Sequence, residues 1–256
     1  MLKTSEQYSL GIIGGLGPFA SAKFVETIYR RHSNKKIEQS FPNIVLLSDP
    51  SFPDRTSFLL NGKQDILLDL LTKKINQLVS CGSSKIIVAC FTMHYFIPIL
   101  PTDIQDKIIS LVSVALKKVL ELKISVLLIC TKGSALFKVF EQNPYWEKAK
   151  KYIVKPTDHD QENLHSLIYD LKKNKKLHSA KNFIIKLVKK YHASGFIAGC
   201  TELHLLTTRT AMLKDQSDII CIDPLITIAD ELLILLHNKN INNAAIERAF
   251  NEECAI

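Results

Sequence analysis

The amino-acid sequence predicts an α/β fold in which two similar domains with parallel-sheet cores are related by a pseudo-twofold axis. A strand, loop and helix order recurs along the whole chain, which favours parallel sheets covered by helices. Two short apolar runs strengthen this prediction: residues 86–89 lead into Cys90, and residues 196–198 lead through Gly199 into Cys200. The sequence has no strong internal repeat, so the pseudo-twofold relation is inferred from the two cysteine motifs alone.

Length and composition are those of an ordinary globular protein. The chain has 256 residues, of which 46% are apolar and 23% charged, and this is enough for a large core in one domain or two. Its apolar runs are shorter than the roughly 18 residues that a membrane span requires. We therefore expect no membrane segment and no extensive disorder.

The first half of the chain alternates strands and helices. An apolar run predicts a strand at residues 10–13, and the glycine-rich residues 14–18 then lead into a helix at residues 20–31. Glycines allow close approach of the backbone, and the amides that open a helix can hold an anion. Because the spacing G-x-G-x-x-G is absent, we interpret this as a small-anion or carboxylate loop and not as a dinucleotide loop. The remaining elements predicted here are a strand at 44–47, a proline-rich loop at 48–56, a helix at 64–79 and the buried strand at 86–89.

The second half continues the same alternation after Pro101. A helix is predicted at residues 104–120, followed by a strand at residues 124–129 that ends near Thr131. Hydroxyls and a glycine again follow the end of this strand. The further elements predicted are a short strand at 152–155, helices at 161–173 and 180–192, strands at 196–198 and 219–222, and helices at 225–237 and 242–253.

These elements divide into two predicted domains. Residues 1–101 together with residues 222–256 form the first domain, which contains Cys90, and residues 102–221 form the second, which contains Cys200. Ligands bind at the carboxyl ends of the strands in open α/β sheets. Two thiols at two such strand ends therefore predict a site in the cleft between the domains.

Charge and cysteine content exclude several classes of function. The net charge is +8, but the lysines lie in helix-like stretches at 172–176 and 186–190 without interleaved aromatic residues, so we expect a solvated basic face and no nucleic-acid partner. Such a charge attracts anionic small molecules. The six cysteines, at 81, 90, 130, 200, 221 and 254, lie in apolar segments of a large chain, which predicts reduced thiols in the cytoplasm. They lack zinc spacing, so no metal is expected.

The N-terminal segment imitates a signal peptide only superficially. Lys3 precedes an apolar stretch, and a small-residue sequence follows at residues 20–22. Glu6 and the glycines of residues 14–17 interrupt the apolar stretch, so a signal peptide is not expected.

Each candidate site residue has a simpler structural alternative. Cys90 is followed by Thr92 and His94, so it is a candidate nucleophile or base; the alternative for either strand-end cysteine is a buried small hydrophobe. Arg55 follows a strand end and can hold a carboxylate through two parallel hydrogen bonds. The alternative is a solvated arginine, or one paired with its neighbour Asp54.

Several motifs, taken together in this order, resemble the aspartate/glutamate racemases. These enzymes are cofactor-independent and have two similar α/β domains, each of which contributes one cysteine. The resemblance covers nearly the whole chain. It rests on Gly14-Gly15-Leu16-Gly17-Pro18, Pro53-Asp54-Arg55-Thr56, Cys90-Phe91-Thr92-Met93-His94, Thr131-Lys132-Gly133-Ser134, Gly199-Cys200-Thr201-Glu202 and Asp223-Pro224.

The resemblance implies a racemase of aspartate or glutamate that uses two cysteines and no cofactor. Cys90 and Cys200 would lie on opposite faces of the substrate α-carbon, one as thiolate base and the other as thiol acid, because inversion through a planar carbanion needs both. An amino-acid substrate and a homodimer are the partners implied. The resemblance also assigns substrate-binding positions to Gly15, Gly17, Arg55, Thr56, Phe91, Thr92, Thr131, Thr201 and Glu202. His94 and Glu202 are either acid/base helpers or capping and orienting groups.

The sequence departs from the family pattern at Phe91, where the family normally has asparagine. An aromatic ring lacks the hydrogen-bonding groups of an amide. We expect the ring to point into the cleft, which predicts slow turnover of aspartate or a substrate with an apolar portion; the alternative is a ring turned into the core. Other candidate functions are a related thiol isomerase acting on hydantoins, maleate or arylmalonates, a catalytically silent small-molecule-binding protein, and a nucleic-acid-binding protein.

Overall fold

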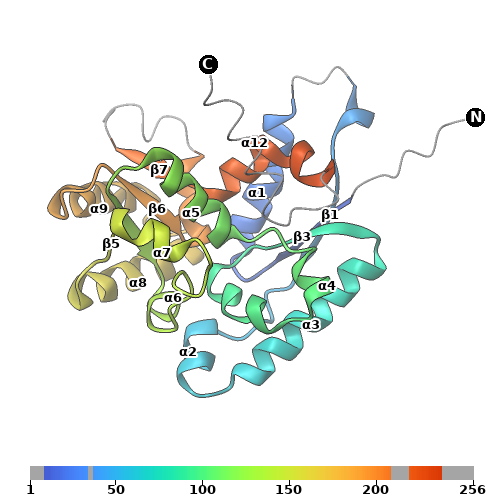
Figure 1. Cartoon of the computed structure of the whole chain (residues 1–256), viewed down its shortest axis with the longest axis horizontal. Coiled ribbons are helices and arrows are strands. Elements are labelled where there is room, and N and C mark those ends of the chain that lie inside the picture. The colour runs from blue at the N-terminus through green and yellow to red at the C-terminus, as the bar shows by residue number, and fades with distance from the viewer. Residues whose placement is uncertain (1–8, 34–36, 209–218, 238–256) are drawn as a thin grey trace, which may run out of the picture.

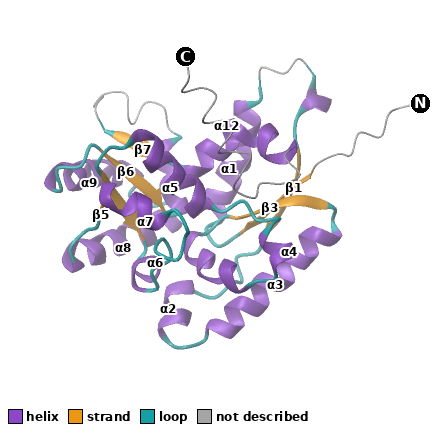
Figure 2. Ribbon diagram, in the orientation of Figure 1, coloured by secondary structure: helices purple, strands orange, loops and turns teal. Residues whose placement is uncertain are grey.

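The computed structural model describes residues 9–33, 37–208 and 219–237. Two parallel sheets lie side by side, each flanked by helices (Figure 1, Figure 2), which confirms the predicted fold class. The sheet from the first half of the chain lies on the right in Figure 1, and the sheet from the second half lies on the left. The predicted helix at 242–253 falls outside the described residues.

The first sheet has three parallel strands in the order β2-β1-β3. All six residues of its central strand β1 are buried, because apolar side chains cover both faces of a strand that has neighbours on each side. The strand bounds are β1 (Ser9–Gly14), β2 (Asn43–Ser48) and β3 (Ser83–Val88). These strands correspond to the three that the sequence predicted for this half, at 10–13, 44–47 and 86–89; β3 starts earlier than predicted and ends one residue sooner.

The second sheet has four parallel strands in the order β5-β4-β6-β7. Its central strands β4 and β6 are buried throughout. The strand bounds are β4 (Val126–Cys130), β5 (Ile153–Val154), β6 (Gly195–Gly199) and β7 (Ile220–Ile222). Both sheets therefore direct the carboxyl ends of their inner strands toward polar or cysteine-containing loops.

Helices follow the strands on both sides of each sheet. The α-helices are α1 (Pro18–Arg31), α2 (Arg55–Leu60), α3 (Gln64–Ser80), α4 (Thr102–Gln105), α5 (Leu111–Leu122), α6 (Lys132–Leu136), α7 (Trp146–Ala149), α8 (Asp158–Lys172), α9 (Leu177–Lys190), α10 (His204–Thr207) and α12 (Pro224–His237). The 3₁₀-helices are η1 (Glu38–Ser40), η2 (Phe91–Ile99), η3 (Lys150–Tyr152) and η4 (Thr201–Leu203). Within the described ranges, no helix is both long and apolar enough to span a membrane.

The predicted helix at residues 104–120 is wrong, because two helices replace it. Between α4 and α5 the chain forms a parallel bridge from Ile108 to Ile86 of β3. Two backbone hydrogen bonds fix this bridge, from the amide of Ile86 to the carbonyl of Lys107 at 2.7 Å and from the amide of Ile109 to the carbonyl of Ile86 at 2.8 Å. Because the carbonyl of Lys107 and the amide of Ile109 are bonded to β3, they cannot form the hydrogen bonds of a continuous helix.

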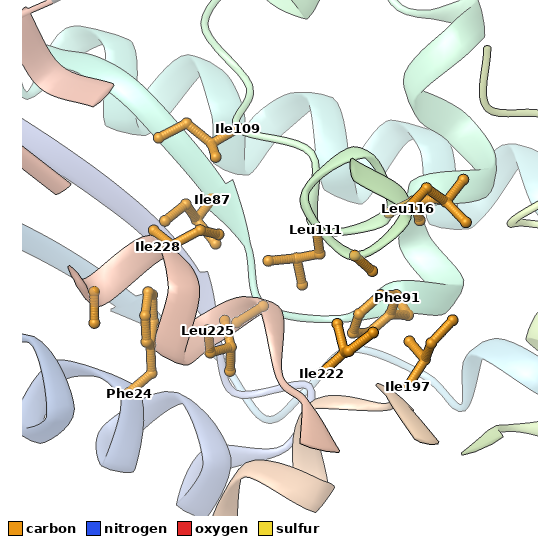
Figure 3. Close-up of a cluster of buried hydrophobic side chains, with 14 of the residues drawn as sticks. Phe24, Ile87, Phe91, Ile109, Leu111, Leu116, Ile197, Ile222, Leu225 and Ile228 are labelled. Carbon is orange, nitrogen blue, oxygen red and sulfur yellow. The ribbon is translucent and has the colours of Figure 1, made fainter. Parts of the chain in front are cut away.

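One hydrophobic cluster joins the two halves of the protein (Figure 3). On β3, Ile87 belongs to this shared cluster, whereas Ile86 belongs to a second cluster confined to residues 13–100. On β4, Leu128 belongs to the shared cluster, whereas Leu127 belongs to a third cluster confined to residues 127–206. Because side chains alternate between the faces of a strand, one face of each sheet is buried against the other half of the protein.

Helix α12 contributes to this shared core from the end of the described chain. It packs against α1 and against α5, which lie on opposite sides of the predicted domain boundary at residue 101. Ile222, assigned from sequence to the first domain, ends β7 of the second sheet. The division into residues 1–101 with 222–256 and residues 102–221 stays a prediction.

Candidate active site

The two strand-end cysteines occupy equivalent places in the two sheets. Cys90 follows β3 and is the N-cap of η2, and Cys200 follows β6 and is the N-cap of η4. The exposed fraction is 9% for Cys90 and 6% for Cys200. The hydroxyl of Thr201 donates a hydrogen bond to the carbonyl oxygen of Ala89 at 3.3 Å, so the residues beside the two cysteines are in direct contact.

Cys200 forms a hydrogen bond with Glu202. Its Sγ donates to the carboxylate Oε2 at 2.7 Å, and the hydroxyl of Thr201 donates to the same oxygen at 3.4 Å. Burial raises the pKa of the Cys200 thiol well above its usual value, and the charge of Glu202 raises it further. Cys200 is therefore a protonated thiol at neutral pH, ready to donate a proton.

The absence of a side chain at Gly17 leaves room for the carboxylate of Glu202. A β-carbon at position 17 would lie 2.0 Å from Oε1 of Glu202, so the carboxylate contacts the start of α1. Gly15 is a turn residue with φ of +85°, and a β-carbon there would meet the backbone of Asp49. The amide of Gly15 donates to the hydroxyl of Ser21 at 3.3 Å. Gly17 is thus in contact with the site, whereas Gly15 shapes the loop that carries it.

Arg55 is a buried cation in the same region, with an exposed fraction of 7%. Its Nη2 donates to the carbonyl of Leu16 at 2.6 Å and its Nη1 to the carbonyl of Pro53 at 3.1 Å. Burial alone would lower its pKa, but the nearby acidic groups of Cys90, Asp54 and Glu202 raise it above the usual value.

Arg55 is therefore not the solvated arginine of the alternative interpretation. Backbone carbonyls orient its guanidinium near Cys90, Asp54 and Glu202. The remaining N–H groups are the ones that could bind a substrate carboxylate.

Three hydroxyl groups from the two halves form a closed triangle. Thr92 Oγ1 lies 3.1 Å from Thr131 Oγ1 and 3.0 Å from Ser134 Oγ, and the latter two lie 3.0 Å apart. Thr56 lies beside this group, because a β-carbon at Gly133 would be 2.6 Å from its Oγ1. Thr56, Thr92 and Thr131 were predicted; Ser134 belongs to the same sequence motif but was given no role.

The expectation that Phe91 points into the cleft is wrong. Its exposed fraction is 2%, and its ring belongs to the shared hydrophobic cluster (Figure 3). It stacks on Phe140 with ring centroids 5.5 Å apart and on His94 at 5.9 Å. An aromatic ring is more stable among these apolar groups than facing polar substrate, so the ring of Phe91 packs in the core.

His94 is an orienting group in this structure. The amide of Leu111 donates to its Nε2 at 3.0 Å, so Nδ1 carries the ring proton and donates to the carbonyl of Cys90, also at 3.0 Å. Burial lowers the pKa of His94 to about 4, which keeps the ring neutral. It therefore fixes the backbone of Cys90 to the start of α5.

Helix α8 contributes residues that the sequence analysis missed. The hydroxyl of Tyr169 donates to Asp54, and burial raises the pKa of Tyr169. The Nζ of Lys172 lies 4.2 Å from the ring centroid of Tyr169, and its positive charge partly opposes the rise in the pKa of Cys200. From the sequence, Lys172 was expected on a solvated basic face. A run of lysines does not indicate which of them lies near a site.

A cavity of about 390 Å³ lies away from the two thiols. It is lined by His94 and by residues of α5, and neither cysteine lines it. In the described part of the chain, no group of three or more His, Cys, Asp or Glu side chains could hold a metal ion.

Comparison with known structures gives the same architecture. The aspartate racemase of Picrophilus torridus superposes with a TM-score of 0.73 at 23% sequence identity, covering 90% of this chain and 94% of that one. The glutamate racemase of Francisella tularensis, solved in complex with D-glutamate, gives 0.63 at 15% identity, covering 93% and 86%. The allantoin racemase of Klebsiella pneumoniae gives 0.54 at 12% identity, covering 89% and 88%. At these identities the likeness is one of fold.

The family is established by sequence. Residues 13–232 match the Asp/Glu/Hydantoin racemase family in a single span, which includes both cysteine motifs and the loops around them. The resemblance found in the sequence motifs is thereby confirmed, and the chain belongs to the Asp/Glu/Hydantoin racemase family.

Proposed function

We propose that the protein racemises an acidic amino acid, aspartate or glutamate, with Cys90 and Cys200 as the two acid/base groups. The observation that carries this proposal is the contact between the two cysteine segments, in which Thr201 donates a hydrogen bond to the residue before Cys90. This contact supports the proposal that two thiols from two sheets act on one substrate. Opposed acid and base groups are what inversion of a stereocentre requires.

The proposed reaction moves one proton off the α-carbon and another onto it. A thiolate at Cys90 takes the α-proton, and the electron pair of the broken bond stays on the carbon. Cys200 then donates its Sγ proton to the opposite face, so that Cys90 ends as thiol and Cys200 as thiolate. The reverse direction exchanges the two roles. Glu202, which accepts the proton of Cys200 in a hydrogen bond, orients the thiol for this transfer.

Two cations support an acidic substrate. Arg55 lies within the electrostatic reach of both Cys90 and Glu202, and the charge of Lys172 acts on Cys200. A substrate with two carboxylates would meet both cations, and binding of the α-carboxylate reduces the charge that opposes carbanion formation. Phe91 does not oppose this choice, because its ring is packed in the core.

Proton exchange at the α-carbon tests the proposal. L- and D-aspartate and L- and D-glutamate are incubated with the protein in heavy water, and incorporation of deuterium is followed by NMR. We expect exchange with inversion for one of the two acids. Cys90→Ser and Cys200→Ser should each abolish inversion, with residual exchange from one enantiomer only. Racemisation at the wild-type rate by either variant would contradict the assignment of the thiols.

Independence from cofactors and the assembly state belong to the same proposal. We expect full activity after dialysis against a chelator, without pyridoxal phosphate, and a homodimer in size-exclusion chromatography with light scattering. A strict requirement for metal or pyridoxal phosphate would contradict the thiol mechanism. A cytoplasmic location is proposed from the reduced cysteines.

A further inference from the structure

Each strand-end cysteine is followed four residues later by a buried histidine. His94 follows Cys90 and His204 follows Cys200, and the exposed fractions of the two histidines are 4% and 0%. Their partners differ. Among the described residues, His94 forms hydrogen bonds to backbone groups, whereas the ring of His204 faces two side chains from other elements.

His204 connects three elements of the fold. Its Nδ1 lies 2.7 Å from Oδ2 of Asp223, the residue before α12. Its Nε2 lies 2.9 Å from Oγ1 of Thr27 in α1, and that hydroxyl also donates to the carbonyl of Lys23 at 2.9 Å. Asp223 accepts a further hydrogen bond from the amide of Leu225 at 3.0 Å, so the carboxylate caps α12 as well.

The contact between His204 and Asp223 is a charge-assisted one. Burial alone would raise the pKa of Asp223, but the charge and hydrogen bond of His204, with bonds from Thr207 and the amide of Leu225, bring it below the usual value. A carboxylate only accepts hydrogen bonds, so Nδ1 of His204 donates. Removal of the ring would leave a buried carboxylate with fewer donors, which is costly in a low-dielectric interior.

Helix α1 contacts the Cys200 segment at two points. At its start, Gly17 adjoins the carboxylate of Glu202. Ten residues further along the chain, Thr27 meets His204. One contact is at Glu202 and the other is two residues later at His204, so both hold the segment whose carboxylate accepts the hydrogen bond of the Cys200 thiol.

We propose that His204 is a positioning residue for the Cys200 half of the active site: through Thr27 and Asp223 it holds residues 200–204 against α1, so that Glu202 faces the Cys200 thiol. The proposal rests on the proposed function in assigning Cys200 a proton to transfer. His204 is fully buried, so it acts through Cys200 and Glu202 and does not touch the substrate.

The kinetic test uses His204→Asn and Thr27→Val, with His159→Asn, an exposed histidine on α8, as matched control. The equilibrium constant of a racemisation is one, so kcat/KM falls equally in both directions and does not locate the affected step. We expect a fall of about ten- to a hundredfold, typical of a displaced catalytic group.

The isotope effect of α-deuterated substrate locates the step. It should rise for the enantiomer from which Cys200 removes the proton, identified by the residual exchange of Cys200→Ser and Cys90→Ser, and should not rise for the other. Equal isotope effects for the two enantiomers, unchanged from wild type, would overturn the proposal. So would wild-type kcat/KM in both variants. Where His204→Asn does not fold, Thr27→Val, which removes a single hydroxyl, gives the same measurements.

A second measurement is independent of the substrate. Alkylation by iodoacetamide, read by mass spectrometry of the peptides, compares the two thiols in one sample. Cys200 should react severalfold faster in His204→Asn and in Thr27→Val than in wild type, with Cys90 unchanged, because the released segment exposes its sulfur. Unchanged alkylation of Cys200, or an equal increase at both thiols, would overturn the positioning role. Absence of exchange with every acid in the wild type would defeat the proposed function, and the alkylation would still decide the role of His204.

Discussion

At the scale of single residues, Glu202 contacts several groups of the candidate site. It accepts a hydrogen bond from the Cys200 thiol, adjoins Gly17, and contributes to the raised pKa of Arg55. The carboxylate therefore favours a protonated Cys200 and a charged Arg55 at the same time. Replacement of Glu202 should therefore alter the pKa of the Cys200 thiol while leaving the fold intact.

We predict that Glu202→Gln lowers the pKa of Cys200 relative to wild type, because it removes a neighbouring negative charge. The pKa of Cys200 is raised in the folded protein, so the protonated thiol stabilises the fold below the ordinary thiol pKa of 9.0, and this contribution is lost as the pH rises above it. Urea denaturation at pH 7 to pH 10 should show a shallower loss of unfolding free energy in Glu202→Gln. The same pH dependence in both proteins would contradict this assignment of the charge.

Phe91 gives the second prediction at this scale. Phe91→Asn should destabilise the protein by about 3–5 kcal/mol, the cost of deleting a buried aromatic ring, and should not accelerate turnover of aspartate or glutamate. Phe91→Leu, which keeps an apolar side chain, is the control and should lose less. Urea denaturation and deuterium exchange measure the two effects. A stable Phe91→Asn that is faster on either acid would place the ring in the cleft after all.

The residue scale also shows what sequence could reveal about the site. Cys90, Cys200 and Arg55 could be assigned to the candidate site because each follows a strand end, and ligands bind at the carboxyl ends of parallel strands. Lys172 was missed because its place depends on how α8 packs over the first half. The direction of Phe91 was mispredicted for a similar reason. Whether its ring faces the cleft or the core depends on how the segment after Cys90 is oriented, and the sequence does not show this.

At the scale of elements, short helices decide the geometry around the thiols. The 3₁₀-helices η2 and η4 start directly at the cysteines, and α2 starts at Arg55. The long elements were predictable from apolar periodicity, but helices of three to nine residues carry too few repeats to give such a signal. The break between α4 and α5 was hidden likewise, because it depends on a bridge to a strand about twenty residues earlier.

The loop between β1 and α1 gives the prediction at this scale. Gly17→Ala should push the Glu202 carboxylate away from Cys200, since the new β-carbon would lie 2.0 Å from Oε1. We expect racemisation to fall about a hundredfold, the usual scale for an acid/base group, with little change in the melting temperature because a side-chain end can move.

Gly62→Ala is the control, because it should lower stability without lowering activity. Gly62 has φ of +67° and open space around its β-carbon position, so alanine there should cost about 1–2 kcal/mol of stability through backbone strain and leave activity unchanged. Wild-type activity in Gly17→Ala would remove the contact with Glu202 from the mechanism.

At the scale of the whole molecule, the two halves share one core. The cluster around Ile87, Leu116 and Ile197 includes both sheets and α12 (Figure 3). Sequence predicted that both faces of the central strands are buried, but not that one face of each sheet is covered by the other half. Which apolar faces meet is a property of the tertiary arrangement and is not encoded in the period of any single strand.

The shared core predicts cooperative unfolding of the two halves. Leu67 belongs to the hydrophobic cluster of the first half. Trp146, the only tryptophan of the sequence, lies in the second half and reports on it by fluorescence. Leu67→Ala should lower stability by about 2–5 kcal/mol, and the fluorescence of Trp146 and the far-UV circular dichroism should report the same shift. Leu164→Ala, in the cluster of the second half, should behave alike. A fluorescence transition that Leu67→Ala leaves in place would mean that the halves unfold independently.

The burial of both sulfur atoms has a consequence for successive turnovers. Each proposed inversion ends with the proton on the opposite thiol from where it began, and little of either sulfur reaches water. Until proton exchange with solvent restores the thiolate at Cys90 and the thiol at Cys200, the protein can act only on the enantiomer that it has just produced. At high substrate concentration the interconversion of these two protein forms, and not the chemistry at carbon, would limit the flux. A mixture started from one labelled enantiomer would then pass transiently beyond its equilibrium isotopic composition.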